Sequence, residues 1–256
     1  PQTARYVIDK ALARLGSDGG WLEPREVRDV LAAFGIGLPL EETANSADEA
    51  AEIAETIGGP VAVKVIAPSA LHKSDVGGVL LDVEGDEAVR EAYENVRAAV
   101  EDPEGVLIQQ MVPGGHEVLI GMTEDPSFGP LLAFGLGGVY VELLKDVAFR
   151  TLPLTDLEAS TMVKEVKGYR VLEGYRGLPA GDVHAVEEAL LRVSTMIEAI
   201  PELAEMDLNP VKVLEPGDGV QVVDARLRVQ PIVGGWAPEL IDIPSVASRA
   251  RRPVGG

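Results

Sequence analysis

Cysteine is absent from the 256 residues, and basic residues are scarce. Without cysteine the chain has no disulfides, no thiolate catalysis and no thiolate metal site. Only 22 Lys and Arg stand against 42 Asp and Glu, for a formal net charge of −20, so we do not expect a general nucleic-acid binder. No apolar run reaches about eighteen residues and no basic-then-apolar signal pattern opens the chain, so we expect neither a membrane span nor export. These absences predict a cytoplasmic protein in which any bound polyanion is met by a local basic site, helped by metal.

Helical and strand patterns alternate through the first 110 residues. Apolar residues recur at helical spacing over residues 24–34, 46–57 and 86–101, whereas residues 61–66, 79–83 and 106–111 read as strands. This order predicts an α/β lobe with helices packed on a sheet. Pro113, Gly114 and Gly115 then break the chain. We expect a first lobe at about residues 22–110 and a second at about residues 111–230 that includes the N-terminal helix. Residues 231–256 resemble a linker or C-terminal tail.

One lysine interrupts the apolar strand that opens residues 61–81, VAVKVIAPSALHKSDVGGVLL. A buried ammonium needs a negative partner, and a phosphate would serve for Lys64. Gly77 and Gly78 would let backbone N–H groups approach an anion closely. The alternative is that Lys64 reaches solvent at the strand end and that the two glycines form an ordinary hairpin turn. A second glycine run at residues 135–138 is likewise either a phosphate contact or a tight turn.

The last third of the chain carries a predicted β-hairpin with oxygen ligands. Residues 211–214 and 220–225 are apolar strands around a Gly-Asp-Gly turn, which brings Asn209 and Asp224 opposite each other. Strand alternation points Asp207 to the same face, and Arg226 could add a charge there. Two carboxylates and a carboxamide are hard ligands suited to Mg²⁺ that bridges phosphates. The alternative is a solvated edge hairpin with ordinary surface acids. Together with the lysine strand, these features describe a nucleotide clamped between two lobes.

Taken in order, the lysine strand and five further motifs resemble the ATP-grasp domain of the NDP-forming acyl-CoA synthetases. The motifs are HKSDVGGV, DPSFGPLLAFGLGGVYVELLKDVAFR, GYRG, EMDLNP and VVDAR. That group includes ADP-forming acetyl-CoA synthetase and is related to the β subunit of succinyl-CoA synthetase. The resemblance runs over about residues 21–228 and implies an ATP-grasp fold, ATP or ADP and Mg²⁺ as cofactors, and ligase activity.

Individual roles follow from the resemblance. Lys64 matches the lysine that reaches the nucleotide phosphates, and Gly77 with Gly78 matches the loop that closes over them. A segment between the lobes matches the backbone that contacts adenine, and it consists of Gln109, Gln110, Met111 and Val112; Gln110 stands where relatives often carry an acid. Glu117 matches the acid near the ribose. Asn209 and Asp224 match the magnesium ligands, with Asp207 as their neighbour.

His72 matches a histidine that relays phosphate between a distant acyl-phosphate site and ADP. A neutral imidazole is a competent phosphoryl acceptor near neutral pH, so the relay is chemically sound; the alternative is a loop histidine bonded to Asp75. His116 and His184 read as surface residues.

The resemblance also implies a partner, because no CoA-binding fingerprint is present and CoA would bind to a separate domain or subunit. Two alternatives stay open at this point. One is a regulatory ATP-grasp module fused to a GNAT-type protein acetyltransferase, and the other is a carboxylate–amine ligase.

Overall fold

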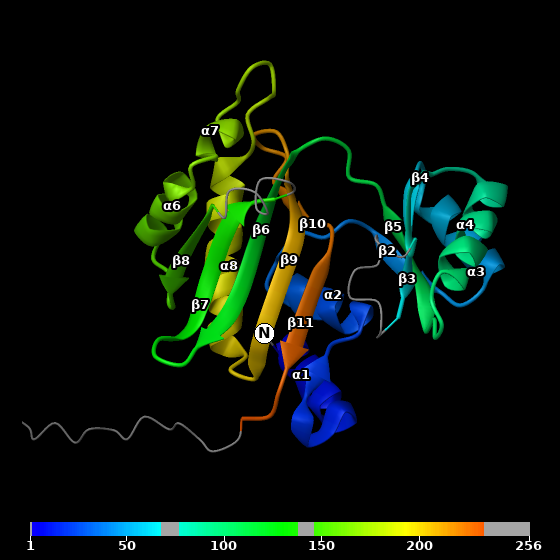
Figure 1. Cartoon of the computed structure of the whole chain (residues 1–256), viewed down its shortest axis with the longest axis horizontal. Helices are drawn as coiled ribbons and strands as arrows, with labels where there is room; N and C mark the ends of the chain where they lie inside the picture. The colour runs from blue at the N-terminus through cyan, green and yellow to red at the C-terminus, as the bar shows by residue number, and fades with distance from the viewer. Residues whose placement is uncertain (1, 68–76, 138–145, 233–256) are drawn as a thin grey trace, which may run out of the picture.

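Two antiparallel sheets in two lobes make up this computed structural model, which describes residues 2–67, 77–137 and 146–232 (Figure 1). The smaller sheet has the strand order β2-β5-β3-β4. Its strands are β2 (Glu41–Ala44), β5 (Gly105–Gln110), β3 (Val61–Ile66) and β4 (Val79–Val83). The mixed helix and sheet architecture predicted from the sequence is confirmed.

Helices α3 (Ala47–Ile57) and α4 (Asp86–Ala98) cover one face of the smaller sheet (Figure 1). Ser46 begins α3 as predicted, because its side chain accepts a hydrogen bond from Glu49 N at 3.1 Å. Between helices and sheet lies a small core rich in valine and alanine, which includes Val61, Val63, Val65, Tyr93 and Ile108. Since strand residues alternate between faces, these valines leave Lys64 on the opposite face of β3, away from the two helices.

The larger sheet has the order β1-β11-β9-β6-β7-β8, with β10 paired to β9. Its strands are β1 (Gly20–Trp21), β6 (His116–Asp125), β7 (Gly129–Leu136), β8 (Val147–Thr151), β9 (Leu203–Val213), β10 (Val220–Val222) and β11 (Ala225–Val229). Strands β9 and β10 form the expected hairpin, in which Val213 pairs with Val220.

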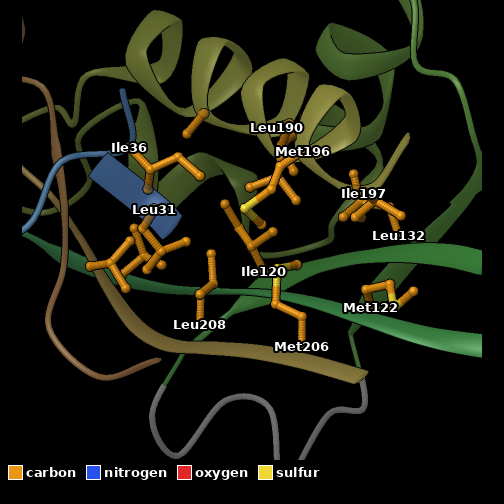
Figure 2. Packing of buried hydrophobic residues seen from close by; sticks show 14 of the residues in the cluster. Leu31, Ile36, Ile120, Met122, Leu132, Leu190, Met196, Ile197, Met206 and Leu208 are labelled. Atoms are coloured by element: carbon orange, nitrogen blue, oxygen red, sulfur yellow. The ribbon is translucent and has the colours of Figure 1, made fainter. Parts of the chain in front are cut away.

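Helices pack on one face of this larger sheet (Figure 1). They are α1 (Gln2–Leu15), α2 (Pro24–Ala33), α6 (Asp156–Glu165), α7 (Tyr169–Leu172) and α8 (Val183–Ala199); a short 3₁₀ turn, η1 (Gly16–Asp18), follows α1. Figure 2 shows Leu190, Met196 and Ile197 of α8 above Ile120 and Met206 of the sheet. Each fully buried leucine or isoleucine contributes about 1.5–3 kcal/mol relative to an exposed one, so this layer dominates the stability of the lobe. In the described ranges, no helix combines the length and apolar character that crossing a membrane requires.

Asp182 fixes the start of α8 and also the hairpin turn. Its Oδ1 accepts a hydrogen bond from Ala185 N at 3.0 Å, and its Oδ2 accepts from Gly217 N at 2.9 Å and from Gly219 N at 3.2 Å. Desolvation acts to raise the pKa of Asp182, but these three backbone N–H groups together hold it below its ordinary value. One carboxylate therefore ties the predicted helix to the predicted hairpin.

The structure differs from the expected lobe boundary at α2. Its apolar residues Val27, Val30 and Leu31 belong to the core of the larger lobe, together with Ile36, although the sequence suggested that residues 22–110 form one lobe. The smaller sheet and its helices instead begin with β2 at residue 41. An amphipathic stripe shows which side of a helix is buried but not which sheet buries it, and this is the reason for the difference.

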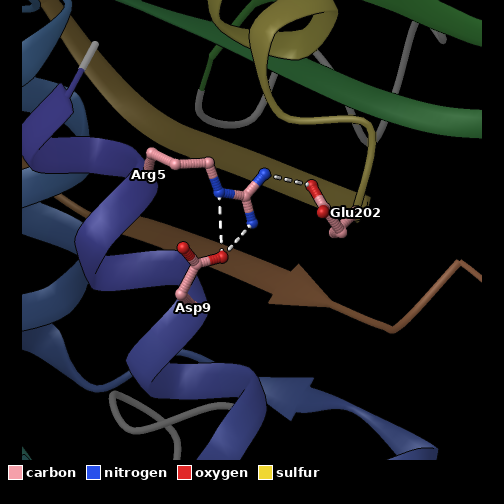
Figure 3. A network of polar contacts seen from close by, with 3 residues as sticks. All are labelled: Arg5, Asp9 and Glu202. Atoms are coloured by element: carbon pink, nitrogen blue, oxygen red, sulfur yellow. Dashed lines mark hydrogen bonds and ion pairs between the residues drawn. The ribbon is translucent and has the colours of Figure 1, made fainter.

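An arginine network attaches α1 to the larger lobe. Arg5 Nη1 donates to Glu202 Oε2 at 2.9 Å, at the turn between α8 and β9, and Arg5 Nε donates to Asp9 Oδ1 at 2.9 Å (Figure 3). The apolar side of the same helix buries Ala4, Ile8 and Ala11. The helix is thus held by both apolar burial and charge.

Candidate functional site

Lys64 lies between the two lobes. The residue is only 8% exposed, and Nζ donates a hydrogen bond to Val223 O of the larger lobe at 3.0 Å. Burial lowers the pKa of Lys64, while the negative charges of Asp224 and Glu41 oppose that shift. Of the two interpretations open from the sequence, the structure favours the buried ammonium over a side chain that reaches solvent at the strand end.

Gln109 and Glu41 share this buried polar region with Lys64. Gln109 Nε2 donates to Glu41 Oε2 at 2.6 Å and to Val223 O at 3.0 Å, and the residue is 2% exposed. Burial raises the pKa of Glu41, whereas the bond from Gln109 and the charges of Lys64 and Arg28 oppose the rise. Gln109 Oε1 is buried and has no hydrogen-bond partner among the described residues. A buried acceptor without a hydrogen bond is destabilising, so Gln109 Oε1 suits a site where a ligand or a water molecule donates a hydrogen bond to it.

The hairpin brings the predicted oxygen ligands together through a β-bulge. Asn209 and Pro210 of β9 stand opposite the single residue Leu119 of β6, because Val118 pairs with Val211 and Ile120 pairs with Leu208. Asn209 N donates to Asp224 O at 3.0 Å, which sets the two residues side by side as the sequence indicated.

Asp207 also lies on the open face of the sheet. It pairs with Arg226 of β11, and Asp207 and Asn209 are exposed while Leu208 between them is buried. Partial burial raises the pKa of Asp207, the charge of Asp224 adds to the rise, and Arg226 opposes it. Two carboxylates in mutual repulsion would gain from a cation between them.

The chemistry of this donor set fits Mg²⁺ because all three side chains offer oxygen. Among the residues that the structure describes, no group of three or more His, Cys, Asp or Glu is placed to hold a metal. A magnesium ion bound by Asn209, Asp224 and Asp207 would therefore keep waters or take phosphate oxygens as its other ligands.

Two cavities contain most of the predicted nucleotide residues. The larger has a volume of about 680 Å³ and is lined by Gln110, Met111 and Val112, with the loop at residues 178–180 and the hairpin end. The smaller, about 390 Å³, is lined by Lys64, Gln109, Asp224, Glu41 and Arg226, together with residues of α1 and α2. Both volumes lie in the range of small-molecule sites. The structure thus divides the segment 109–112, with Gln109 facing the lysine and the next three residues facing the other cavity.

Part of the backbone of this connecting segment is already bonded inside the smaller lobe. Gln110 N donates to Leu40 O at 2.8 Å, and Met111 N donates to Pro60 O at 3.2 Å. Glu117, at the start of β6, forms an ion pair with Lys212 Nζ at 2.9 Å. A ribose contact by Glu117 would have to share its carboxylate with that lysine.

The structure describes Gly77 and Gly78 and all but the last residue of the second glycine run. Gly77 is exposed with φ +75°, and Gly78 O accepts a hydrogen bond from Val65 N at 2.8 Å, which extends the β3–β4 pairing. A Cβ on Gly137 would lie 2.9 Å from Glu117 C, and one on Gly135 would lie 2.8 Å from Asp146 O, so both glycines permit close backbone packing. His72 lies outside the described residues, as do its neighbour Asp75 and Gly138.

Glu41 is the residue of this site that the sequence reasoning did not identify. The segment Glu-Glu-Thr-Ala reads as an exposed edge strand, and the pairing of β2 with β5 alone places Glu41 opposite Gln109. The sequence could have indicated Glu41 as a site residue only if the pairing of β2 with β5 had been known beforehand.

Comparisons with known proteins agree with this geometry. Residues 13–229 match the family model described as the ATP-grasp domain, so the chain belongs to the ATP-grasp domain family. The chain is 47% identical over 232 residues to acetate–CoA ligase [ADP-forming] I of Archaeoglobus fulgidus, covering 88% of this chain and 33% of that protein. It is 46% identical over 209 residues to the β subunit of acetate–CoA ligase [ADP-forming] II of Pyrococcus furiosus, covering 79% of this chain and 89% of the subunit.

Solved structures give the same result. An acetyl-coenzyme A synthetase 1 of Ca. Korarchaeum cryptofilum, in complex with coenzyme A and Ca-AMPCP, has a TM-score of 0.82 and 39% identity, covering 89% of this chain and 100% of that one. The same enzyme with coenzyme A and Mg-AMPPCP, its phosphohistidine segment pointing towards the nucleotide binding site, has a TM-score of 0.77 and 38% identity, with the same coverage. The chain therefore spans about a third of the A. fulgidus ligase but most of the separate P. furiosus subunit.

Proposed function

We propose that the chain is the nucleotide-binding, phosphoryl-transferring part of an ADP-forming acyl-CoA synthetase. The overall reaction is acyl-CoA + ADP + phosphate ⇌ carboxylate + ATP + CoA. The observation that carries the proposal is the buried ammonium of Lys64, which lies between the lobes near Asp224 in a chain whose relatives are ADP-forming ligases. An enzyme that keeps a cation desolvated at this position gains a strong interaction with a phosphate.

The residues have distinct roles in this proposal. Lys64 binds the nucleotide phosphates, and Gly77 and Gly78 approach them with their backbone. The segment of Gln109, Gln110, Met111 and Val112 binds the base, and Glu117 lies near the ribose. Magnesium, held by Asn209, Asp224 and Asp207, supplies charge neutralisation of the phosphates when bound. These two lobes would form one ATP-grasp domain over residues 1–230.

His72 is the proposed relay. In the direction of ATP formation it carries a phosphoryl group on a ring nitrogen, and the terminal oxygen of ADP displaces that nitrogen to form ATP. The reverse reaction, from ATP, phosphorylates His72 without any CoA, and this makes it the simplest test.

A partner is part of the proposal, because the β-subunit relatives are named as one part of a ligase. We propose that this partner binds CoA and forms the acyl-phosphate, and that both work in the cytoplasm. The regulatory module next to an acetyltransferase is less well supported, since the relatives described above are ligases.

Incubation of the chain with γ-³²P-ATP and Mg²⁺ tests the relay. We expect acid-labile, base-stable label that is lost in His72→Ala and kept in His184→Ala, because His184 is exposed in the first turn of α8 and far from the lysine strand in sequence. Binding of ATP without label, both alone and with the CoA-binding domain of a relative added, would refute the relay and favour a ligand-binding module.

A further inference from the structure

The smaller lobe contacts the backbone carbonyl of Val223, the residue directly before the proposed metal ligand Asp224. Two donors of the smaller lobe bond this one oxygen, Lys64 Nζ and Gln109 Nε2, each at 3.0 Å. The Lys64 ammonium has three N–H donors, so it can bond a phosphate oxygen beside Val223 O or leave this carbonyl when a phosphate draws it away. When the ammonium leaves, Gln109 is the donor that remains on Val223 O and keeps this carbonyl satisfied.

The orientation of the Gln109 side chain decides whether this works. A carboxamide has a donor end and an acceptor end that differ little in shape, so a rotation by half a turn would set Oε1 against Val223 O. The Glu41 carboxylate opposes that rotation, because an ionised carboxylate only accepts hydrogen bonds and lies 2.6 Å from Gln109 Nε2.

Glu41 is itself held in place from the larger lobe. Arg28 Nη1 of α2 donates to the backbone carbonyl of Glu41 at 2.8 Å. The chain of contacts therefore runs from α2 through Glu41 and Gln109 to Val223, and so it returns to the larger lobe beside Asp224.

We propose that Glu41 is a positioning residue of the nucleotide site. It fixes the Gln109 carboxamide so that Gln109 holds the Val223 carbonyl, and this leaves Lys64 able to exchange that carbonyl for a phosphate oxygen. The inference rests on the proposed function, since it assumes that a nucleotide phosphate is what Lys64 receives.

Titration calorimetry with Mg²⁺ and the non-hydrolysable analogue AMP-PNP tests the role of Glu41. In Glu41→Leu the carboxamide can rotate, so a phosphate that draws Lys64 away leaves Val223 O without either donor, and we expect affinity to fall about tenfold. Glu41→Gln retains an acceptor oxygen at the same reach and should bind within about twofold of the unaltered chain. Glu41→Asp keeps the charge but shortens the reach by one carbon, and should be weakened severalfold. The matched control is Glu42→Leu, at the exposed neighbouring position of β2, which should leave affinity unchanged.

The outcomes separate the two claims. If the unaltered chain does not bind Mg²⁺ and AMP-PNP, the proposed function is overturned, and the inference with it. If the chain binds but Glu41→Leu and Glu41→Asp match Glu42→Leu, only the role of Glu41 is overturned. A weakened Glu41→Gln would also overturn it, because the charge of Glu41 and not its hydrogen bond would then matter. Urea unfolding of each variant identifies any that is unfolded, and the Gln and Asp variants then decide the question.

Discussion

Replacing Lys64 by Met separates what the buried ammonium does for the fold from what it does for a nucleotide. Lys64 is 8% exposed, its ammonium donates a hydrogen bond to Val223 O, and burial lowers its pKa despite the opposing charges of Asp224 and Glu41. Because the pKa is lowered, desolvation outweighs the attraction of these two carboxylates, and the charge of Lys64 is a net cost to folding. We therefore expect the free energy of unfolding of Lys64→Met at pH 7 to lie within about 1 kcal/mol of the unaltered chain, or above it.

Nucleotide affinity should respond in the opposite direction. A hydrogen bond to a charged group contributes about 1.5–3 kcal/mol, so losing the ammonium should weaken binding of Mg²⁺ and AMP-PNP roughly ten- to hundredfold. Lys10→Met on α1 is the control, since Lys10 is exposed and should change neither quantity by a measurable amount. Urea unfolding gives the stability and titration calorimetry gives the affinity.

The pH dependence provides a second, independent measure. The pKa of Lys64 is lower in the folded state than its ordinary value of 10.5, so between the two values the unfolded chain holds more protons than the folded chain. The stability of the unaltered chain should therefore rise with pH through this window relative to Lys64→Met. Unchanged nucleotide affinity in the variant would refute the phosphate role of Lys64. A loss of stability above about 2 kcal/mol would refute the view that its burial is a net cost to folding.

Two further predictions concern stability. Asp182→Ala removes the cap of α8 and the acceptor for Gly217 N and Gly219 N, so urea unfolding should show a loss of about 2 kcal/mol, against little change for the exposed Asp218→Ala. The contribution of Asp182 is present above pH 3.8 and should disappear as pH falls through the lower pKa of the folded state; equal effects of the two variants would contradict this reasoning. Arg5→Ala breaks the contact between α1 and Glu202, and we expect a loss of up to about 1 kcal/mol that shrinks in 1 M salt, as thermal or urea unfolding would show. A loss that salt does not change would mean that Arg5 acts through packing of its stem.

Local signals made much of the fold predictable. Ser46 and Asp182 accept hydrogen bonds from the first turns of their helices, as N-cap residues do. A Gly-Asp-Gly turn between two apolar runs is typical of a β-hairpin, and β9 and β10 form one. These features depend on a few adjacent residues, and so a sequence displays them. The position of α2 in the larger lobe depends on contacts with β11, about 200 positions away, and no local pattern encodes that choice.

The sequence likewise predicted some features of the candidate site and missed others. A lysine among β-branched residues indicated a buried charge, and the hairpin indicated that Asn209 and Asp224 are neighbours. The sequence could not show that Gln109 faces Lys64 while Gln110 faces another cavity, because this depends on the face of β5 that the larger lobe covers. Glu41 was missed for the same reason, since its environment is created by strand pairing between distant segments.

The two hydrophobic cores are separate, one in each lobe, and this sets the mechanical character of the molecule. Turning one lobe against the other would leave every side chain of both cores in place. Such a rotation would instead strain or break the hydrogen bonds between the lobes, such as the two that Val223 O accepts. Each of these bonds contributes only about 0.5–3 kcal/mol. A ligand bound with a dissociation constant of about 1 μM releases about 8 kcal/mol, which is several times what one of these bonds contributes. The protein therefore has two separately packed bodies joined by a few polar bonds, and the proposed nucleotide site lies at this joint.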